Sequence, residues 1–126
     1  MARILFVDDE PNIRLFYTGV LADAGHDVRE AASSRETMLA IQRERPDLVI
    51  LDLVLPAMDG IEALRRIREQ GWGVRVVVFT AYGTADRARE ALALGAREFI
   101  GKPFDLERLV QVVSEQVGRA APRNQG

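Results

Sequence analysis

The fold is decided by the stretch Asp47-Leu48-Val49-Ile50-Leu51-Asp52-Leu53-Val54-Leu55-Pro56. Between its two aspartates stand four consecutive apolar residues, a pattern typical of a strand buried on both faces and too short for an ordinary helix. Asp52 therefore stands where a core strand ends. A carboxylate at such a place loses part of its hydration, and nearby cations or hydrogen bonds must offset this loss.

Length and composition describe one domain. At 126 residues about two thirds of the unfolded surface can be buried. The absence of cysteine excludes disulfides and thiolate metal sites. A formal charge of −2 provides no field that would attract nucleic acid, so we expect no direct DNA binding. No apolar run approaches the roughly 20 residues of a membrane span, and no signal peptide is visible, so we expect a cytoplasmic protein without a membrane partner.

Lysine is used at a single position. Of the 17 basic residues only Lys102 is a lysine, and the others are arginines. A coding bias towards arginine would explain the arginines but not this exception. Because lysine is a compact point charge and arginine a wide planar fork, Lys102 indicates a place where the fork does not fit.

Hydrophobic patterns along the chain predict five strands alternating with five helices. The strands are expected over residues 4–7, 28–32, 48–51, 75–79 and 98–101. The helices are expected to begin at Pro11, Ser33, Asp59, Thr84 and Asp105. Two of the strands are apolar throughout, which favours a parallel sheet with helices on both faces. The sequence thus predicts an α/β fold, with residues 1–118 as the domain and residues 119–126 as a flexible tail or linker remnant.

The first helix has apolar residues at spacings of three and four. We expect these residues to face the core: Ile13, Phe16, Tyr17, Val20 and Leu21. Ser33 and Glu36 have the spacing of a capping box, and Asp59 and Glu62 repeat it. His26, the only histidine, is expected to be a solvated loop residue.

Polar side chains follow four of the predicted strands. Asp8 and Asp9 follow the first strand, and Asp52 ends the third. Thr80 ends the fourth strand, and Lys102 follows the fifth. In a parallel sheet these positions share one edge, where ligands bind. Carboxylates that gather there repel one another by about 4 kcal/mol per pair at 4 Å and an effective dielectric near 20, so they require a cation.

Oxygen ligands without histidine or cysteine favour a hard ion such as Mg²⁺. A carboxylate, this ion, a hydroxyl and an ammonium group around one point suit phosphoryl transfer. The residues alone leave open whether Asp9 or Asp52 is the nucleophile. Simpler explanations also exist: Asp8 and Asp9 could cap a helix, and Asp52 could belong to a turn. Thr80 could simply be a strand-end residue, and Lys102 could simply lie on the surface. All of these simpler explanations would have to be true at once.

Four separately spaced motifs run through the chain: Val7-Asp8-Asp9-Glu10-Pro11; Pro46-Asp47-Leu48-Val49-Ile50-Leu51-Asp52-Leu53 with Pro56 and Met58-Asp59-Gly60; Phe79-Thr80-Ala81; and Gly95-Ala96 leading to Lys102-Pro103-Phe104. With these motifs the chain, from about residue 3 to residue 118, resembles the receiver domain of bacterial two-component response regulators. Through Thr80-Ala81-Tyr82-Gly83 and Lys102-Pro103-Phe104-Asp105 it is most similar to the stand-alone sporulation phosphorelay receiver and to receivers of nitrogen-control activators.

The resemblance implies a flavodoxin-like fold with a five-stranded parallel sheet in the order 2-1-3-4-5 and helices on both faces. Asp52 would be the phosphoacceptor, taking a phosphoryl group from a histidine kinase or a histidine phosphotransfer protein. Asp9, Asp52 and the backbone carbonyl of Val54 would bind Mg²⁺, with Asp8 acting largely through water. Mn²⁺ could substitute for Mg²⁺.

The resemblance also implies a switch. Thr80 and Lys102 would bind phosphoryl oxygens, and Phe99 matches the switch aromatic, although a core residue of the fifth strand is its simpler explanation. Val54 and Tyr82 stand where side chains could gate an attacking water. The output would be a changed surface on the fourth helix, fifth strand and fifth helix. Charged residues there could form ion pairs across a homodimer or simply be solvated: Arg87, Arg89, Arg97 and Arg108, with Asp86, Glu90, Glu98 and Glu107.

These implications describe a signalling switch rather than an enzyme, although such a domain catalyses its own phosphorylation and dephosphorylation. Two alternatives remain. A phosphatase with an aspartate nucleophile would need a second carboxylate two residues after the nucleophile, where this chain has Val54. A phosphorylation-independent protein-binding module of the same fold would not need the five site residues, all of which are present.

Overall fold

The computed structural model describes residues 2–53, 60–80, 85–101 and 106–120. It contains five strands: β1 (Arg3–Val7), β2 (Asp27–Ala31), β3 (Leu48–Asp52), β4 (Arg75–Thr80) and β5 (Glu98–Gly101). These alternate with five helices: α1 (Pro11–Asp23), α2 (Ser34–Arg43), α3 (Gly60–Glu69), α4 (Ala85–Ala93) and α5 (Leu106–Ala120). Strands and helices thus follow one another in the predicted order.

The strands form one parallel sheet in the order β2-β1-β3-β4-β5. The central strand β3 is buried along its whole length, because both of its faces are covered. The register pairs Val49 with Leu5 of β1 on one side and with Val76 of β4 on the other. The predicted α/β fold class and strand order are therefore confirmed.

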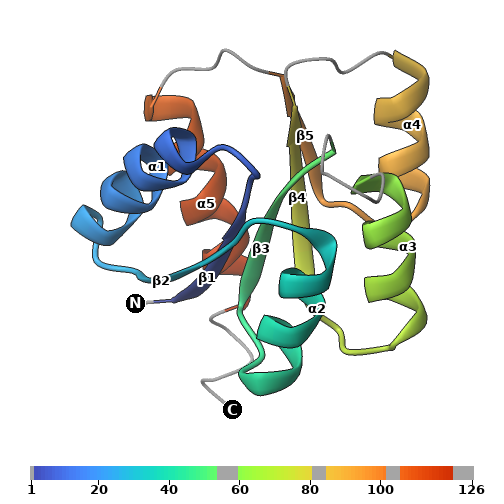
Figure 1. The fold of residues 1–126 in the computed structure, drawn as a ribbon. Helices are drawn as coiled ribbons and strands as arrows, with labels where there is room; N and C mark the ends of the chain where they lie inside the picture. Colours follow the sequence, from blue (N-terminus) through green and yellow to red (C-terminus); the bar gives the residue numbers. More distant parts are fainter. Residues whose placement is uncertain (1, 54–59, 81–84, 102–105, 121–126) are drawn as a thin grey trace.

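Alternate side chains of β3 supply two separate cores, because successive residues of a strand point to opposite faces. Val49 and Leu51 belong to the core beneath α2, α3 and α4. Leu48 and Ile50 belong to the core beneath α1 and α5. Figure 1 shows the resulting three layers, with the sheet between the two groups of helices.

The start of α2 follows the predicted capping pattern. The Ser33 hydroxyl accepts a hydrogen bond from the Glu36 N–H at 3.1 Å. The Glu36 carboxylate in turn accepts one from the Ala32 N–H at 3.0 Å. The first bond satisfies a backbone donor of the first turn, and the second bonds the N–H of the residue before the cap, Ala32, where an ideal capping box would bond that of Ser33. Asp59, the predicted cap of α3, lies outside the described residues.

The prediction that Phe16 faces the core is wrong. Its side chain is 53% exposed, and the neighbouring Leu15 is 72% exposed. The buried side of α1 is centred on Leu21, with Tyr17 packed against the same core. Since successive helical residues are about 100° apart, Phe16 lies to one side of Tyr17 on the helix, and the two rings form a T-shaped pair with centroids 5.0 Å apart.

His26 is not the fully solvated residue that we expected. It is half-buried in the connection between α1 and β2, and its Nδ1 atom has no hydrogen-bond partner among the described residues. Burial lowers the pKa of His26 from its ordinary value of 6.5.

Helix α5 continues to Ala120, two residues past the predicted end of the domain. Within the described ranges no helix is long and apolar enough to cross a membrane.

Candidate metal centre

The carboxyl ends of β1 and β3 bring three aspartates together. Val7, the last residue of β1, is paired with Leu51 of β3. Asp8 follows Val7 and Asp52 follows Leu51, so these two aspartates lie next to each other. Asp9 follows Asp8 directly. The predicted meeting of these side chains at one edge of the sheet is confirmed.

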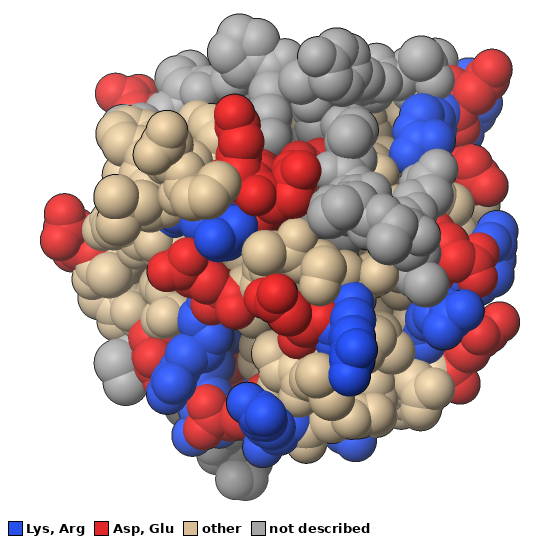
Figure 2. All heavy atoms as spheres, viewed as in Figure 1, with Lys and Arg blue, Asp and Glu red and all other residues tan. Residues whose placement is uncertain are grey.

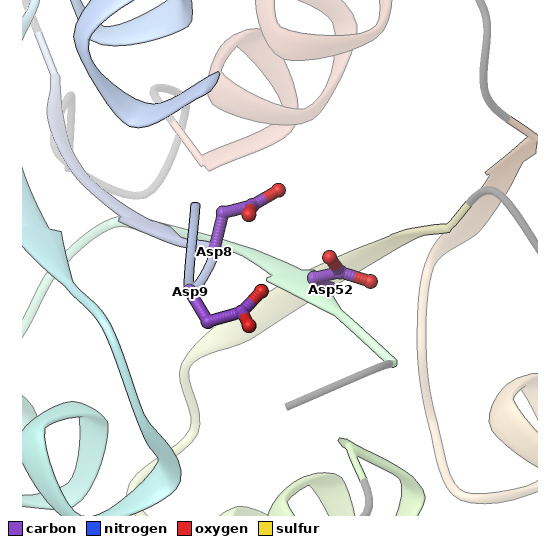
Figure 3. A group of neighbouring side chains, drawn as sticks. All are labelled: Asp8, Asp9 and Asp52. Carbon is purple, nitrogen blue, oxygen red and sulfur yellow. The ribbon is translucent and has the colours of Figure 1, made fainter. Parts of the chain in front are cut away.

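One carboxylate oxygen from each of the three aspartates lies within 4.8 Å of the others. Figure 3 shows the three carboxyl groups around one space, Asp8 and Asp9 from the end of β1 and Asp52 from the end of β3. Asp8 and Asp52 are only 1% and 4% exposed, whereas Asp9 is exposed. Figure 2 shows acidic side chains gathered at this part of the surface, beside the grey atoms. Of the three, Asp9 is therefore the carboxylate that solvent reaches most readily.

Backbone contacts hold Asp8 in place. Its carboxylate accepts a hydrogen bond from the Glu10 N–H at 2.9 Å, and its own N–H donates to the Ala31 carbonyl at 3.1 Å. The Arg14 guanidinium donates to the Asp8 backbone carbonyl at 2.7 Å and is paired with Glu30 at 3.1 Å. Arg14 therefore positions the end of β1 through its hydrogen bond to the Asp8 backbone. The charge of Arg14 is paired with that of Glu30.

The chemistry of this group fits a hard divalent cation. At 4.8 Å and an effective dielectric near 20, two ionised carboxylates repel each other by about 3 kcal/mol. All three donors are carboxylate oxygens, the ligands that Mg²⁺ prefers. One oxygen of each aspartate lies close enough to the others for the three residues to share one such ion, directly or through water. The three aspartates can therefore hold such an ion.

The structure describes only some of the other predicted site residues. Thr80 ends β4 and is paired with Gly101 of β5, one residue beyond the pair of Asp52 with Phe79. Its backbone therefore lies at the same edge of the sheet as the aspartates. Val54, Tyr82 and Lys102 lie outside the described residues, and their roles stay predictions.

Phe99 is half-buried on β5. It is paired with Val78 of β4 and packs against the core beneath α2, α3 and α4. The structure therefore agrees with the simpler explanation, that Phe99 is a core residue of the fifth strand. A role of Phe99 as a switch stays a prediction.

Several charged residues of the predicted output surface have partners within the chain. Arg89 is paired with Asp86, and Arg108 with Glu98 at 3.1 Å. Glu90 lies 3.8 Å from Arg65 of α3. These pairs exist without a second copy of the chain, so they favour neither a dimer nor a monomer.

Gly60 packs beside the site in a way that the sequence patterns did not explain. Its N–H donates to the Leu53 carbonyl at 2.8 Å. A Cβ atom at this position would lie 2.3 Å from the Cα of Leu53 and 2.6 Å from the carbonyl oxygen of Asp52. The first residue of α3 thus packs directly on the backbone that carries Asp52. Its place in the motif Met58-Asp59-Gly60 was the only signal in the sequence.

Comparison with known proteins identifies the family. The family model described as the response regulator receiver domain matches residues 4–114. The chain belongs to this family. Receiver domains are the phosphoacceptor modules of two-component signalling systems, so this chain is a signalling module of that kind.

The relatives of this receiver domain include both short and long proteins. It is 38% identical over 113 residues to sporulation initiation phosphotransferase F of Bacillus subtilis, covering 90% of this chain and 91% of that one. It is 38% identical to the nitrogen assimilation regulatory protein NtrX of Azorhizobium caulinodans, covering 90% of this chain and 25% of the relative. The resemblance to sporulation and nitrogen-control receivers is therefore confirmed.

Among solved structures, the receiver domain is similar to a CheY-like response regulator receiver domain protein from Methanospirillum hungatei. The TM-score is 0.91 at 28% identity, with 100% of this chain and 99% of the other covered. This structural agreement extends over the whole sheet and its helices.

Proposed function

We propose that this receiver domain is a switch in which Asp52 takes a phosphoryl group from a phosphohistidine of a histidine kinase or a histidine phosphotransfer protein. The observation that carries the proposal is the meeting of three carboxylates within 4.8 Å at the shared end of β1 and β3. Of the three, Asp52 is the one that belongs to a fully buried strand, so the scaffold defines its position best.

The proposed step is a phosphoryl transfer between two side chains. A carboxylate oxygen of Asp52 attacks the phosphorus atom, a P–O bond forms, and the P–N bond to the histidine ring breaks. The electron pair of that bond returns to the ring nitrogen, which takes up a proton. Water later attacks the resulting acyl phosphate, releases inorganic phosphate and restores the carboxylate.

Asp9, Asp52 and the backbone carbonyl of Val54 are proposed to hold Mg²⁺, or Mn²⁺ in its place, with Asp8 contributing through water. When bound, the ion neutralises the negative charge of the carboxylates and of the incoming phosphoryl group. The Glu10 N–H, bonded to the Asp8 carboxylate, keeps that side chain directed into the site. Thr80 and Lys102 are proposed to bind phosphoryl oxygens, and Val54 and Tyr82 to limit the access of water.

The proposed output is a change on the surface of α4, β5 and α5. Phosphorylation adds negative charge at the end of β3, and movement of Thr80 towards it would open space behind β4. Phe99, half-buried on the neighbouring strand, could then turn inward. Because phenylalanine has no hydroxyl, the switch would be a change of packing. A homodimer through the same surface is part of this proposal.

The test is labelling by a small phosphodonor. With Mg²⁺ the protein is expected to gain one phosphoryl group in an alkali-labile bond, detected by intact-protein mass spectrometry. Asp52→Asn should abolish this gain. Asp47→Asn is the matched control, because it removes an aspartate at the other end of the same strand.

Each result has a clear meaning. Undiminished labelling of Asp52→Asn would assign the nucleophile elsewhere, with Asp9 as the first alternative. No labelling of the unaltered protein would favour the phosphorylation-independent binding module. Rapid multiple turnover of the donor without a stable label would favour the phosphatase alternative.

A further inference from the structure

Arg14 of α1 contacts the metal centre through the backbone of an aspartate and not through a carboxylate. Its guanidinium donates from Nη1 to the Asp8 carbonyl oxygen at 2.7 Å. This oxygen belongs to the peptide group that joins Asp8 to Asp9. Because the peptide group is planar, fixing its carbonyl limits the directions of the side chains on both sides. One hydrogen bond therefore acts on two of the three carboxylates.

A second contact holds the same guanidinium. The Arg14 Nε donates to the Glu30 carboxylate of β2 at 3.1 Å. The Arg14 side chain is 17% exposed and that of Glu30 is 48% exposed, so the pair reaches from the interior to the surface. Among the described residues the ion pair of Arg14 is with Glu30, and none joins it to a carboxylate of the metal centre. The planar fork is thus held by two partners through two different nitrogen atoms.

Helix stability alone does not account for Arg14. It is the fourth residue of α1, near the helix end whose partial positive charge favours acids over bases. The first turn of α1 contains no acidic residue that would offset this. A cation that is largely withdrawn from solvent at this position therefore has its main compensation in Glu30 and in the Asp8 carbonyl.

We propose that Arg14 and Glu30 act together as positioning residues of the metal centre. Arg14 fixes the peptide between Asp8 and Asp9. Glu30 keeps the guanidinium on that peptide, so that it does not turn to the aspartate carboxylates and compete with the cation. The inference rests on the proposed function, because it concerns the affinity of the same carboxylates for Mg²⁺.

The first experiment is a Mg²⁺ titration of the full chain without a phosphodonor, followed by the amide NMR shifts of residues at the end of β1. Arg14→Met keeps an unbranched side chain but removes the charge and the N–H donors. We expect it to bind Mg²⁺ about tenfold more weakly, the loss typical for groups that orient metal ligands. An effect of charge alone has the opposite sign, because removing a nearby cation strengthens the binding of another.

The matched control is Arg29→Met. Arg29 stands next to Glu30 on β2 and is paired with Asp27 at 3.5 Å. The variant removes the same charge from a neighbouring position, and we expect it to bind Mg²⁺ as the unaltered chain does. An equal loss of affinity in Arg29→Met and Arg14→Met would overturn the proposal.

A double-mutant cycle tests the role of Glu30. Glu30→Gln keeps the size of the side chain and removes its charge, and we expect a severalfold loss of Mg²⁺ affinity. If Glu30 acts through Arg14, adding Glu30→Gln to Arg14→Met causes no further loss. A loss of the same size in both backgrounds would mean that Glu30 attracts the ion by its own charge, and would overturn its assigned role.

Amide hydrogen exchange in EDTA provides a measurement without metal. The Glu10 N–H donates to the Asp8 carboxylate at 2.9 Å. We expect this N–H to exchange faster in Arg14→Met and in Glu30→Gln, while the amides of α5 keep their rates. Faster exchange throughout the chain would indicate a general loss of stability and would contradict a positioning role.

If Arg14→Met does not fold, Arg14→Lys takes its place in each measurement. It keeps the charge, but an ammonium group cannot hold both partners in the geometry of the fork, so weaker Mg²⁺ binding is again expected. Unchanged or tighter binding by the folded Arg14 variant would overturn this proposal and leave the labelling of Asp52 unaffected. Absence of Mg²⁺ binding in the unaltered chain would overturn the metal site itself and this inference with it.

Discussion

Asp8 and Asp52 are almost fully buried, whereas Asp9 in the same group is exposed. Burying a carboxylate removes hydration that other groups must replace, so two buried aspartates side by side are a poor arrangement for stability alone. The backbone around them compensates in part, through the Glu10 N–H and the Arg14 guanidinium. At the scale of single residues, the site therefore depends on groups that sequence spacing did not identify. The sequence predicted the aspartates as site residues because they follow strands. The contact of Arg14 with Asp8 could not be predicted, because it forms only in the folded chain.

His26 provides a prediction on pH. Because burial favours its neutral form, its pKa is lower in the folded chain than the ordinary 6.5. The unfolded chain then binds a proton more readily, so the stabilising contribution is complete above the unfolded pKa and is lost as pH falls through the folded pKa. We expect His26→Gln to reduce the loss of stability below about pH 6.5, measured by urea unfolding between about pH 8 and pH 5. Identical pH profiles of both proteins would contradict this account of His26.

At the scale of elements, the contact of α3 with the end of β3 decides the position of Asp52. Gly60, the first residue of α3, lies against the backbone of Leu53 and the carbonyl of Asp52. The sequence predicted both elements, and the ends of its strands were within one residue of those observed for β3 and β4. It could not predict how closely they approach, because that distance is set by packing between segments.

We predict that Gly60→Ala destabilises the fold by about 1 to 3 kcal/mol or more, because its Cβ would meet backbone that cannot move aside freely. The shift of β3 should also weaken the response of the melting temperature to Mg²⁺. Gly19→Ala in α1 is the matched control, since a Cβ there meets nothing within 4 Å. It should be neutral or stabilising by up to about 1 kcal/mol, as alanine is favoured over glycine inside helices. Equal stability of the two variants in chemical denaturation would show that the close approach is relieved by other movements.

At the scale of the whole molecule, the chain separates its charges between the two edges of the sheet. Three aspartates meet at the carboxyl edge and three arginines line a hollow at the other, although the net charge is only −2. Overall composition therefore conceals two strongly charged regions. The topology produces them, because parallel strands bring all the residues that follow strands to one edge and those that precede strands to the other.

Global stability should report the repulsion among the aspartates. In metal-free buffer we expect Asp9→Ala to leave the melting temperature unchanged or to raise it, because one of three repelling charges is removed. Mg²⁺ should stabilise the unaltered protein, by about 1.4 kcal/mol when its free concentration is about ten times the Kd, and should not stabilise Asp9→Ala. Asp23→Ala, which removes an exposed aspartate at the other end of α1, should keep the full response.

A clear loss of stability in metal-free Asp9→Ala would mean that Asp9 chiefly caps α1. The observed start of α1 has Glu10 at the cap position and no side-chain cap hydrogen bond, which agrees with the repulsion account.

The sequence by itself determined the alternation of strands and helices, the parallel sheet and the three aspartates at its carboxyl edge. These features follow from local patterns, since apolar runs, capping residues and strand ends are read from neighbouring residues. Only the tertiary structure decided that Phe16 is exposed, that Gly60 touches the backbone of β3 and that Arg68 rests on Gly95. The physical reason is that burial and close approach depend on how segments far apart in the chain pack against each other, and no local spacing contains that distance.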